Sequence, residues 1–116
     1  MSDCPFCQRI KAGRYDDRCP DAVTFEPLNP VTLGHRLVVP TVHVADALED
    51  PHITGLVMEY AAEIASLYEA DPCNLITSVG RDATQTVFHL HVHIVPRRSG
   101  DGLALPWTGT EAGGRT

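Results

Sequence analysis

Three histidines alternate with large apolar residues in the segment formed by residues 88–97. A period of two, with Val and Ile at apolar positions, predicts a half-buried β-strand. His89, His91 and His93 would then share one face of the strand, about 7 Å apart at a rise of roughly 3.3 Å per residue. The apolar side chains would face the core: Phe88, Leu90, Val92 and Ile94. Because a neutral imidazole can act as nucleophile, proton carrier or metal ligand, this face is a candidate site. A solvent-facing strand that is merely rich in histidine is the alternative.

Cys4 and Cys7 form a C-x-x-C pair near the beginning of the chain. Such a pair could supply half of a tetrahedral zinc site, which needs two further ligands from elsewhere. A thioredoxin-type redox pair is a second possibility, although no buried parallel strand precedes the cysteines to present them at a helix N-terminus. Two ordinary thiols are the third possibility, and the pair by itself does not decide among them.

Length and charge limit the class of protein. The 116 residues are most simply one domain, because about 100–200 residues per domain is usual. The net charge of −6 argues against a protein that binds the nucleic-acid backbone by counterion release. There is no leader pattern and no run of about 18 apolar residues. We therefore expect a soluble cytoplasmic protein without nucleic-acid or membrane partners, in which the cysteines are thiols or metal ligands.

Two helices are expected to support these residues. Asp50 suits the N-cap and Pro51 the first position of a long helix, whose apolar residues form one stripe as far as Tyr68. A short helix is expected over residues 8–13, where Gly13 ends it.

Four strands are expected, over residues 22–26, 34–40 and 74–79 and in the histidine segment. Residues 80–85 would connect the last two strands as antiparallel neighbours. Residues 14–20 are rich in polar and turn-forming residues, and we expect a loop there.

The histidine segment and two upstream patterns resemble the histidine triad (HIT) family. Residues 85–95 match its signature His-φ-His-φ-His-φ-φ, in which φ is apolar, and residues 34–40 with His43 resemble its upstream glycine-histidine strand. The pair Cys4-x-x-Cys7 resembles the start of its zinc-bearing bacterial members. The resemblance implies an α+β fold with a mostly antiparallel sheet of about five strands and two helices, commonly paired into a homodimer.

On this resemblance the HIT domain spans residues 1–97, and residues 98–116 form a C-terminal tail. The tail is rich in Gly and polar residues, so we expect its end to be disordered unless Trp107 docks on the domain.

The resemblance also implies a nucleotide hydrolase or transferase that acts at an α-phosphate of a small-molecule substrate. His91 is the implied nucleophile, which forms a nucleotidyl-imidazole that water then hydrolyses, so that one difficult step becomes two easier ones. His93 resembles the family's proton-handling third histidine and His35 its supporting histidine. The implied phosphate-binding positions are Ser78, Gln85 and Thr86.

In the metal-bearing branch of the family, the pattern implies one zinc ion held by Cys4, Cys7, His43 and His89. Two cysteines and two histidines form a closed structural set without a vacancy for water. On this interpretation the ion would anchor the N-terminal segment to the histidine segment.

Two positions depart from the family pattern. Thr84 stands where many relatives have Gly, and threonine restricts φ. Pro27 stands where relatives usually carry an Asp or Asn that binds the ribose hydroxyls, and Glu26 or Asn29 is the expected substitute.

Two other functions therefore stay open. The departures would suit a nucleotide-binding or scaffolding protein with weak or no catalysis. A metalloenzyme with open coordination by His89, His91 and His93 is the second, since alternate residues of a strand can point to one ion.

Overall fold

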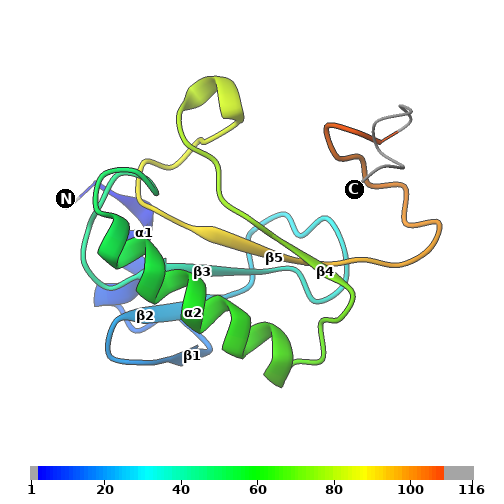
Figure 1. The fold of residues 1–116 in the computed structure, drawn as a ribbon. Coiled ribbons are helices and arrows are strands. Elements are labelled where there is room, and N and C mark those ends of the chain that lie inside the picture. Colours follow the sequence, from blue (N-terminus) through cyan, green and yellow to red (C-terminus); the bar gives the residue numbers. More distant parts are fainter. Residues whose placement is uncertain (1–2, 109–116) are drawn as a thin grey trace.

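The computed structural model describes residues 3–108, and its fold combines two α-helices with one five-stranded sheet (Figure 1). In chain order the elements are α1 (Pro5–Lys11), β1 (Asp17–Arg18), β2 (Ala22–Phe25), β3 (Arg36–Pro40), α2 (Pro51–Leu67), β4 (Cys73–Ile76), the 3₁₀ helix η1 (Arg81–Ala83) and β5 (Val92–Pro96). The expected α+β fold with a five-stranded antiparallel sheet is confirmed. The end of the tail, residues 109–116, lies outside the described residues.

Every strand pairs antiparallel with its neighbours, in the order β1-β2-β3-β5-β4. The expected pairing of the fourth strand with the histidine strand is confirmed, with Ile76 of β4 opposite His93 of β5. On its other side β5 pairs with β3, where His93 lies opposite Leu37. Residues directly opposite each other point to the same face of a sheet, so His93 and Leu37 share a face.

The two faces of the sheet bury two separate clusters of apolar side chains. On one face α2 lies across the strands, which Figure 1 shows at the front of the molecule. This cluster includes Val38, Val57, Ala61, Ile64 and Val92. On the other face α1 contributes one buried aromatic ring, in a cluster formed by Phe6, Val23, Phe25, Leu37 and Val39. His93 therefore lies on the α1 side of the sheet.

Both helices begin at a capping side chain followed by proline. The Asp50 carboxylate accepts hydrogen bonds from the N–H groups of His52 (3.1 Å) and Ile53 (3.3 Å), which confirms the expected start of α2 at Pro51. The short helix α1 begins at Pro5, three residues earlier than expected, because Cys4 serves as its N-cap.

The strand that we expected over the histidine segment begins only at Val92. Residues 88–91 are irregular because tertiary contacts replace the pairing with β3. The N–H of Leu90 donates to the carbonyl of Val44 (2.8 Å), and the ring of His89 is fully buried. The expectation that Phe88 faces the core is wrong, since 40% of this residue is exposed. Leu90, Val92 and Ile94 are buried as expected.

The expected loop over residues 14–20 also contains a strand, because β1 pairs with β2 at two positions, Asp17 with Thr24 and Arg18 with Val23. Both β1 side chains are exposed, so no apolar alternation marks this strand in the sequence.

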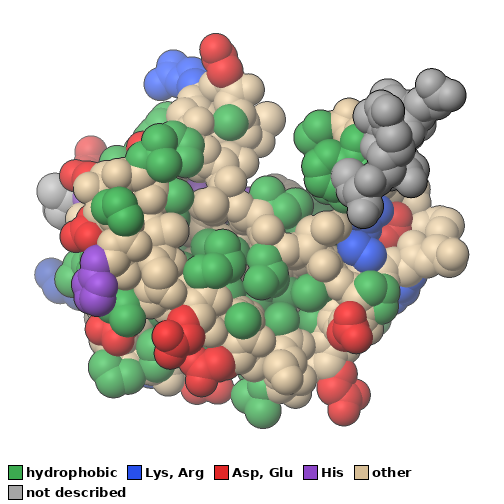
Figure 2. Space-filling view, in the orientation of Figure 1, with side chains coloured by type: hydrophobic (Ala, Val, Ile, Leu, Met, Phe, Trp, Pro, Cys, Tyr) green, Lys and Arg blue, Asp and Glu red, His purple; other side chains and the backbone are tan. Residues whose placement is uncertain are grey.

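The solvent-facing surface around α2 shows hydrophobic side chains bordered by acidic ones (Figure 2). Leu67 and Tyr68 at the end of α2 are 69% and 47% exposed, and Leu75 on the edge strand β4 is 36% exposed. Within residues 3–108, no helix combines the length and the apolar character that crossing a bilayer requires.

Candidate active site and metal centre

Four potential metal ligands from three segments meet at the start of α1. Cys4 and Cys7 lie on the first turn of the helix, His43 follows β3, and His89 precedes β5. Their ligand atoms all lie within 4.8 Å of one another. The Nδ1 atom of His89 is 3.5 Å from each of the two sulfur atoms and 3.2 Å from Nδ1 of His43, which is 3.4 Å from Sγ of Cys7. This cluster could hold a metal ion.

The orientation of His89 suits metal binding. Its Nε2 atom lies 3.0 Å from the carbonyl oxygen of Pro40, to which an N–H donates, so the lone pair of the neutral ring is at Nδ1 and faces the sulfur atoms. Burial is the main cause that lowers the pKa of His89 below its ordinary value, and His43 and His91 lower it further. The ring is therefore neutral, as a metal ligand must be.

His91 has the opposite arrangement of proton and lone pair. Its Nδ1 atom is 2.9 Å from the carbonyl oxygen of His89 and donates to it, which leaves the lone pair at Nε2. Burial lowers the pKa of His91, so the ring is neutral near pH 7. Its ring packs edge-on against Phe6 with the centroids 5.2 Å apart.

A chain of two hydrogen bonds fixes the proton on His93. The backbone N–H of Val31 donates to Nδ1 of His35 (3.1 Å), so His35 carries its proton at Nε2. That nitrogen lies 3.0 Å from Nδ1 of His93, to which it donates, and His93 therefore carries its own proton at Nε2. Burial, followed by the neighbouring His91 and His35, lowers the pKa of His93 to about 4.

His91 and His93 are close enough to act together, with ring centroids 5.1 Å apart. One ring presents a lone pair and the other an N–H donor. Such a pair can attack an electrophilic centre while it stabilises negative charge beside it.

A cavity of about 240 Å³ lies on the α1 side of the sheet, and Phe6, whose ring contacts His91, is one of its lining residues. Phe6 is the common wall, since its ring contacts both His91 and Phe25, the latter with centroids 5.7 Å apart. Glu26 also lines the cavity, and its charge acts on His35, whose pKa it raises against the larger effect of burial. The rest of the lining includes Arg9, Arg14, Pro27, Leu28 and Leu37.

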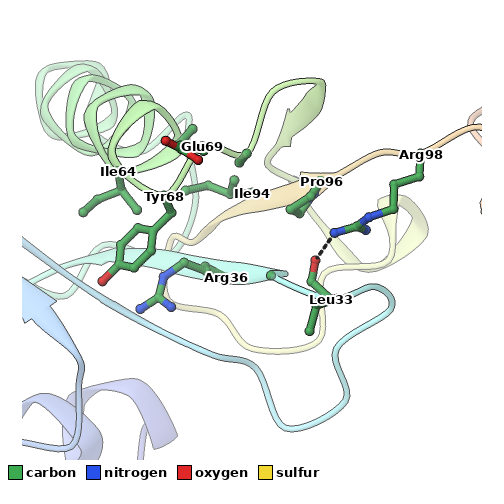
Figure 3. A pocket seen from close by; sticks show the side chains of 11 residues that line it. Leu33, Arg36, Ile64, Tyr68, Glu69, Ile94, Pro96 and Arg98 are labelled. Atoms are coloured by element: carbon green, nitrogen blue, oxygen red, sulfur yellow. Dashed lines mark hydrogen bonds between the residues drawn. The ribbon is translucent and has the colours of Figure 1, made fainter.

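A second cavity of about 250 Å³ lies on the α2 side of the sheet (Figure 3). There Ile64 of α2 and Tyr68, the residue after α2, face Arg36 and Ile94 of the sheet, and Arg98 donates to the carbonyl of Leu33. Neither cavity has a histidine among the described residues that line it, but Phe6 in the wall of the first cavity contacts the ring of His91.

The expected phosphate-binding residues lie in and beside the loop around η1. Thr86 is exposed and Ser78 is half-buried. Gln85 is 2% exposed, and its side chain accepts from the N–H of Gly80 (2.8 Å) and donates to the carbonyls of Ala45 (2.7 Å) and Val87 (3.1 Å). The Gln85 side chain thus holds the loop in its conformation, and both N–H donors of its amide are already used by backbone carbonyls.

The two positions that depart from the family pattern, Thr84 and Pro27, affect the structure differently. Thr84 adopts the left-handed conformation, with φ 77°, so the loop takes a glycine-like path despite the side chain. Pro27 lines the cavity and offers no polar group, whereas the exposed Glu26 lies on the same wall. Asn29 is exposed and is not among the residues that line the cavity.

The structure does not bring the three triad histidines to one ion. At least one nitrogen of each ring has a different partner: Nδ1 of His89 faces the cysteines, Nδ1 of His91 donates to a backbone carbonyl, and Nδ1 of His93 accepts from His35. In the described part of the chain, the Cys4, Cys7, His43 and His89 group is the only metal-ligand cluster found.

Sequence reasoning missed three groups that lie in the cavity wall or beside the histidines. Phe6 was not singled out, although an aromatic residue between two cysteines is a usable signal. Arg9 carries no local signal, because an arginine on a short helix is ordinary. The N–H of Val31 acts through the backbone, which no residue type reveals.

Comparisons with known proteins point to one family. The model of the HIT domain matches residues 16–100. A HIT family protein from Bacillus anthracis superposes with a TM-score of 0.81 and 29% identity, over 98% of this chain and 86% of that one. An adenylylsulfatase from Arabidopsis thaliana is 30% identical over 89% of this chain, which spans only 56% of that relative. An adenosine 5′-monophosphoramidase from Saccharomyces cerevisiae is 29% identical, over 93% of this chain and 72% of the yeast protein.

The family model covers well over half of the chain, and the histidine geometry lies within the matched region. The chain therefore belongs to the HIT family.

Proposed function

We propose that this protein is a nucleotide hydrolase or nucleotidyl transferase that cleaves at the α-phosphate of a nucleoside phosphoramidate or a dinucleoside polyphosphate. The observation that carries the proposal is the complementary pair formed by His91, with its lone pair at Nε2, and His93, with its N–H at Nε2. Two relatives named an adenylylsulfatase and an adenosine 5′-monophosphoramidase support a nucleotide substrate of this kind.

In the proposed reaction, Nε2 of His91 attacks the α-phosphorus, and the bond to the leaving group breaks in line with the new P–N bond. The N–H of His93 donates a hydrogen bond to the departing atom and so stabilises its developing charge. Water then displaces the histidine from phosphorus. Over both steps, one water molecule gives its hydroxyl to phosphorus and its proton to the leaving group, and a nucleoside monophosphate is released.

The loop before the histidine segment is proposed to hold the phosphate. The Gln85 side chain keeps the loop in shape through its three bonds to backbone groups, while the exposed Thr86 and the nearby Ser78 offer hydroxyl donors. We propose that Glu26, which lines the same cavity as Pro27, accepts hydrogen bonds from the ribose hydroxyls in its place. Donors that are fixed before the reaction stabilise charge without reorganisation.

The test is His91→Ala, which we expect to abolish turnover of adenosine 5′-phosphoramidate and the transient nucleotidylated protein seen by mass spectrometry. His52→Ala is the matched control, because His52 is an exposed histidine at the start of α2. Turnover by His91→Ala at the wild-type rate would refute the nucleophile assignment.

We also infer that the metal is a structural zinc ion. Zinc–nitrogen bonds of about 2.0–2.1 Å and zinc–sulfur bonds of about 2.3 Å in a tetrahedron separate two nitrogens by about 3.3 Å and a nitrogen from a sulfur by about 3.6 Å. In the cluster the two nitrogens are 3.2 Å apart, three of the four nitrogen–sulfur pairs are 3.4–3.5 Å apart, and all four ligand atoms lie within 4.8 Å of one another. Elemental analysis should find one zinc per chain, and a chelator-free preparation without metal would remove the inference.

A second candidate function is nucleotide binding without effective turnover. The apolar Pro27 in the cavity wall is the observation that favours it. Calorimetric binding of AMP or GMP together with no turnover of any tested nucleotide would decide for this candidate.

We further propose a homodimer in the cytoplasm, with neither nucleic acid nor membrane as a partner. Among the described residues β4 is an edge strand, and its exposed Leu75 together with the exposed Leu67 of α2 supports an interface between two copies. Light scattering should give twice the chain mass of 12.6 kDa.

A further inference from the structure

Two arginines lie in the wall of the cavity beside the histidines, among mostly apolar neighbours. The guanidinium carbon of Arg9 lies 4.1 Å from the centroid of the Phe25 ring, and its Nε donates to the carbonyl of Arg14 (3.2 Å). These two contacts involve the flat face of the Arg9 guanidinium and its Nε atom. The two Nη groups at the outer edge of the guanidinium have no hydrogen-bond partner among residues 3–108, so they can donate to a ligand.

The charge of Arg9 is not neutralised by the acidic residue of the same cavity. Within residues 3–108 no ion pair joins Arg9 to Glu26, and the only ion pairs of arginine are those of Arg36 with Asp16 and Arg97 with Asp101. Arg9 is also held in place, because it lies on the same short helix as Cys7 and packs on Phe25. A fixed guanidinium with free donors is suited to recognition rather than to general attraction.

The size of the cavity limits what the arginines can contact. A volume of about 240 Å³ is below the usual range of roughly 300–1,000 Å³ for whole drug-sized ligands. It therefore suits one ring system rather than an entire nucleotide. Because Phe6 lines the cavity and its ring centroid lies 5.2 Å from that of His91, a base in the cavity would lie one aromatic ring away from the proposed nucleophile.

We propose that this cavity selects guanine, with Arg9 as the specificity-determining residue and Arg14 as a second donor at its side. The inference rests on the proposed function, because it assigns the base of the same substrate. Guanine presents two adjacent acceptors, O6 and N7, which match the paired donors of one guanidinium. Adenine presents an amino donor beside N7, and this donor would point at the arginine. Cytosine also presents a donor, and uracil a single acceptor.

The test compares guanosine and adenosine 5′-phosphoramidates as substrates of the full-length protein. A bidentate arginine pair discriminates between bases by about 5- to 150-fold, so kcat/KM should favour guanosine within that range. In Arg9→Leu, which keeps an apolar side chain over Phe25 but loses the donors, the ratio should fall to within about twofold. Lys11→Leu removes the same charge from the same helix outside the cavity and should keep the ratio.

The outcomes separate the two proposals. Equal kcat/KM for the two substrates, a preference for adenosine, or an unchanged ratio in Arg9→Leu would overturn the guanine assignment while the hydrolase proposal stands. If neither substrate is turned over, the hydrolase proposal fails, and calorimetry with GMP and AMP decides the base preference. In that case tighter binding of GMP supports the assignment, whereas equal affinity or no binding of either overturns it.

Discussion

Replacing Thr84 with glycine should make the protein more stable. Thr84 has φ 77° and ψ 16°, a left-handed conformation that a β-branched residue adopts only at a cost. Its side chain is exposed, so the substitution removes no buried contact. The hydrogen bonds of the turn are made by the backbone, from the N–H of Thr84 to Arg81 (3.0 Å) and from the N–H of Gln85 to Gly80 (3.1 Å), and glycine keeps both.

The magnitude follows from two opposing terms. The left-handed conformation costs a residue with a Cβ about 1–2 kcal/mol, which glycine avoids. Glycine in turn gives the unfolded chain more freedom, which lowers the free energy of unfolding by about 0.5–1 kcal/mol. The net expectation is a gain of about 0.5–1 kcal/mol, or a rise in Tm of about 2–4 °C for a chain of this size.

The assay is thermal and urea unfolding followed by circular dichroism. Thr86→Gly is the matched control, because Thr86 is also exposed, lies two residues away and is not among the described residues with positive φ. The control should lose about 0.5–1 kcal/mol. If Thr84→Gly lowers the free energy of unfolding as much as the control does, the strain argument is refuted.

Three further predictions concern the metal, the histidines and the tail. Cys7→Ser should lose the bound metal and lower Tm, whereas Cys73→Ser, a free thiol outside the cluster, should keep the metal in elemental analysis. The pKa of His93 is about 4 instead of 6.5, so the unfolded chain binds more protons between these values. The free energy of unfolding should therefore fall as the pH falls from 6.5 to 4, and denaturant titrations should show a shallower fall in His93→Gln. The hydrogen bonds from Arg97 and from two backbone N–H groups hold the pKa of Asp101 well below its usual range. The ionised Asp101 carboxylate thus stabilises the fold above pH 3.8, and this contribution is lost as the pH falls below that value. Asp101→Asn should therefore lower Tm at pH 7 but not in strong acid.

Sequence patterns predicted those elements whose ends are fixed by contacts between residues close together in the chain. The start of α2 followed from Asp50 and Pro51, because an N-cap and the proline after it act within one turn. The two-residue strand β1 could not be predicted, since it depends on backbone bonds to β2 and its side chains stay in solvent.

The histidine segment shows why an alternating pattern can mislead. Alternation describes a strand whose partner continues alongside, but β3 pairs with β5 only as far as Val92. Beyond that point each residue is placed by a distant contact, His89 by the cysteines of α1 and Leu90 by Val44. The residues of the candidate site were nevertheless recognisable by type, because chemistry restricts which side chains can serve.

The ring of Phe6 touches both His89 and His91, with centroids 5.8 and 5.2 Å away, and it stands between the two sulfur-bearing residues of α1. A substitution of Phe6 would therefore change the packing of a candidate metal ligand, of the proposed nucleophile and of the cavity wall together, so its effects could not be assigned to one of them. Arg9 lies one helical turn further on, lines the same cavity and has no ring contact with His91 among the described residues, so its substitution tests the proposed base selection separately from the chemical step.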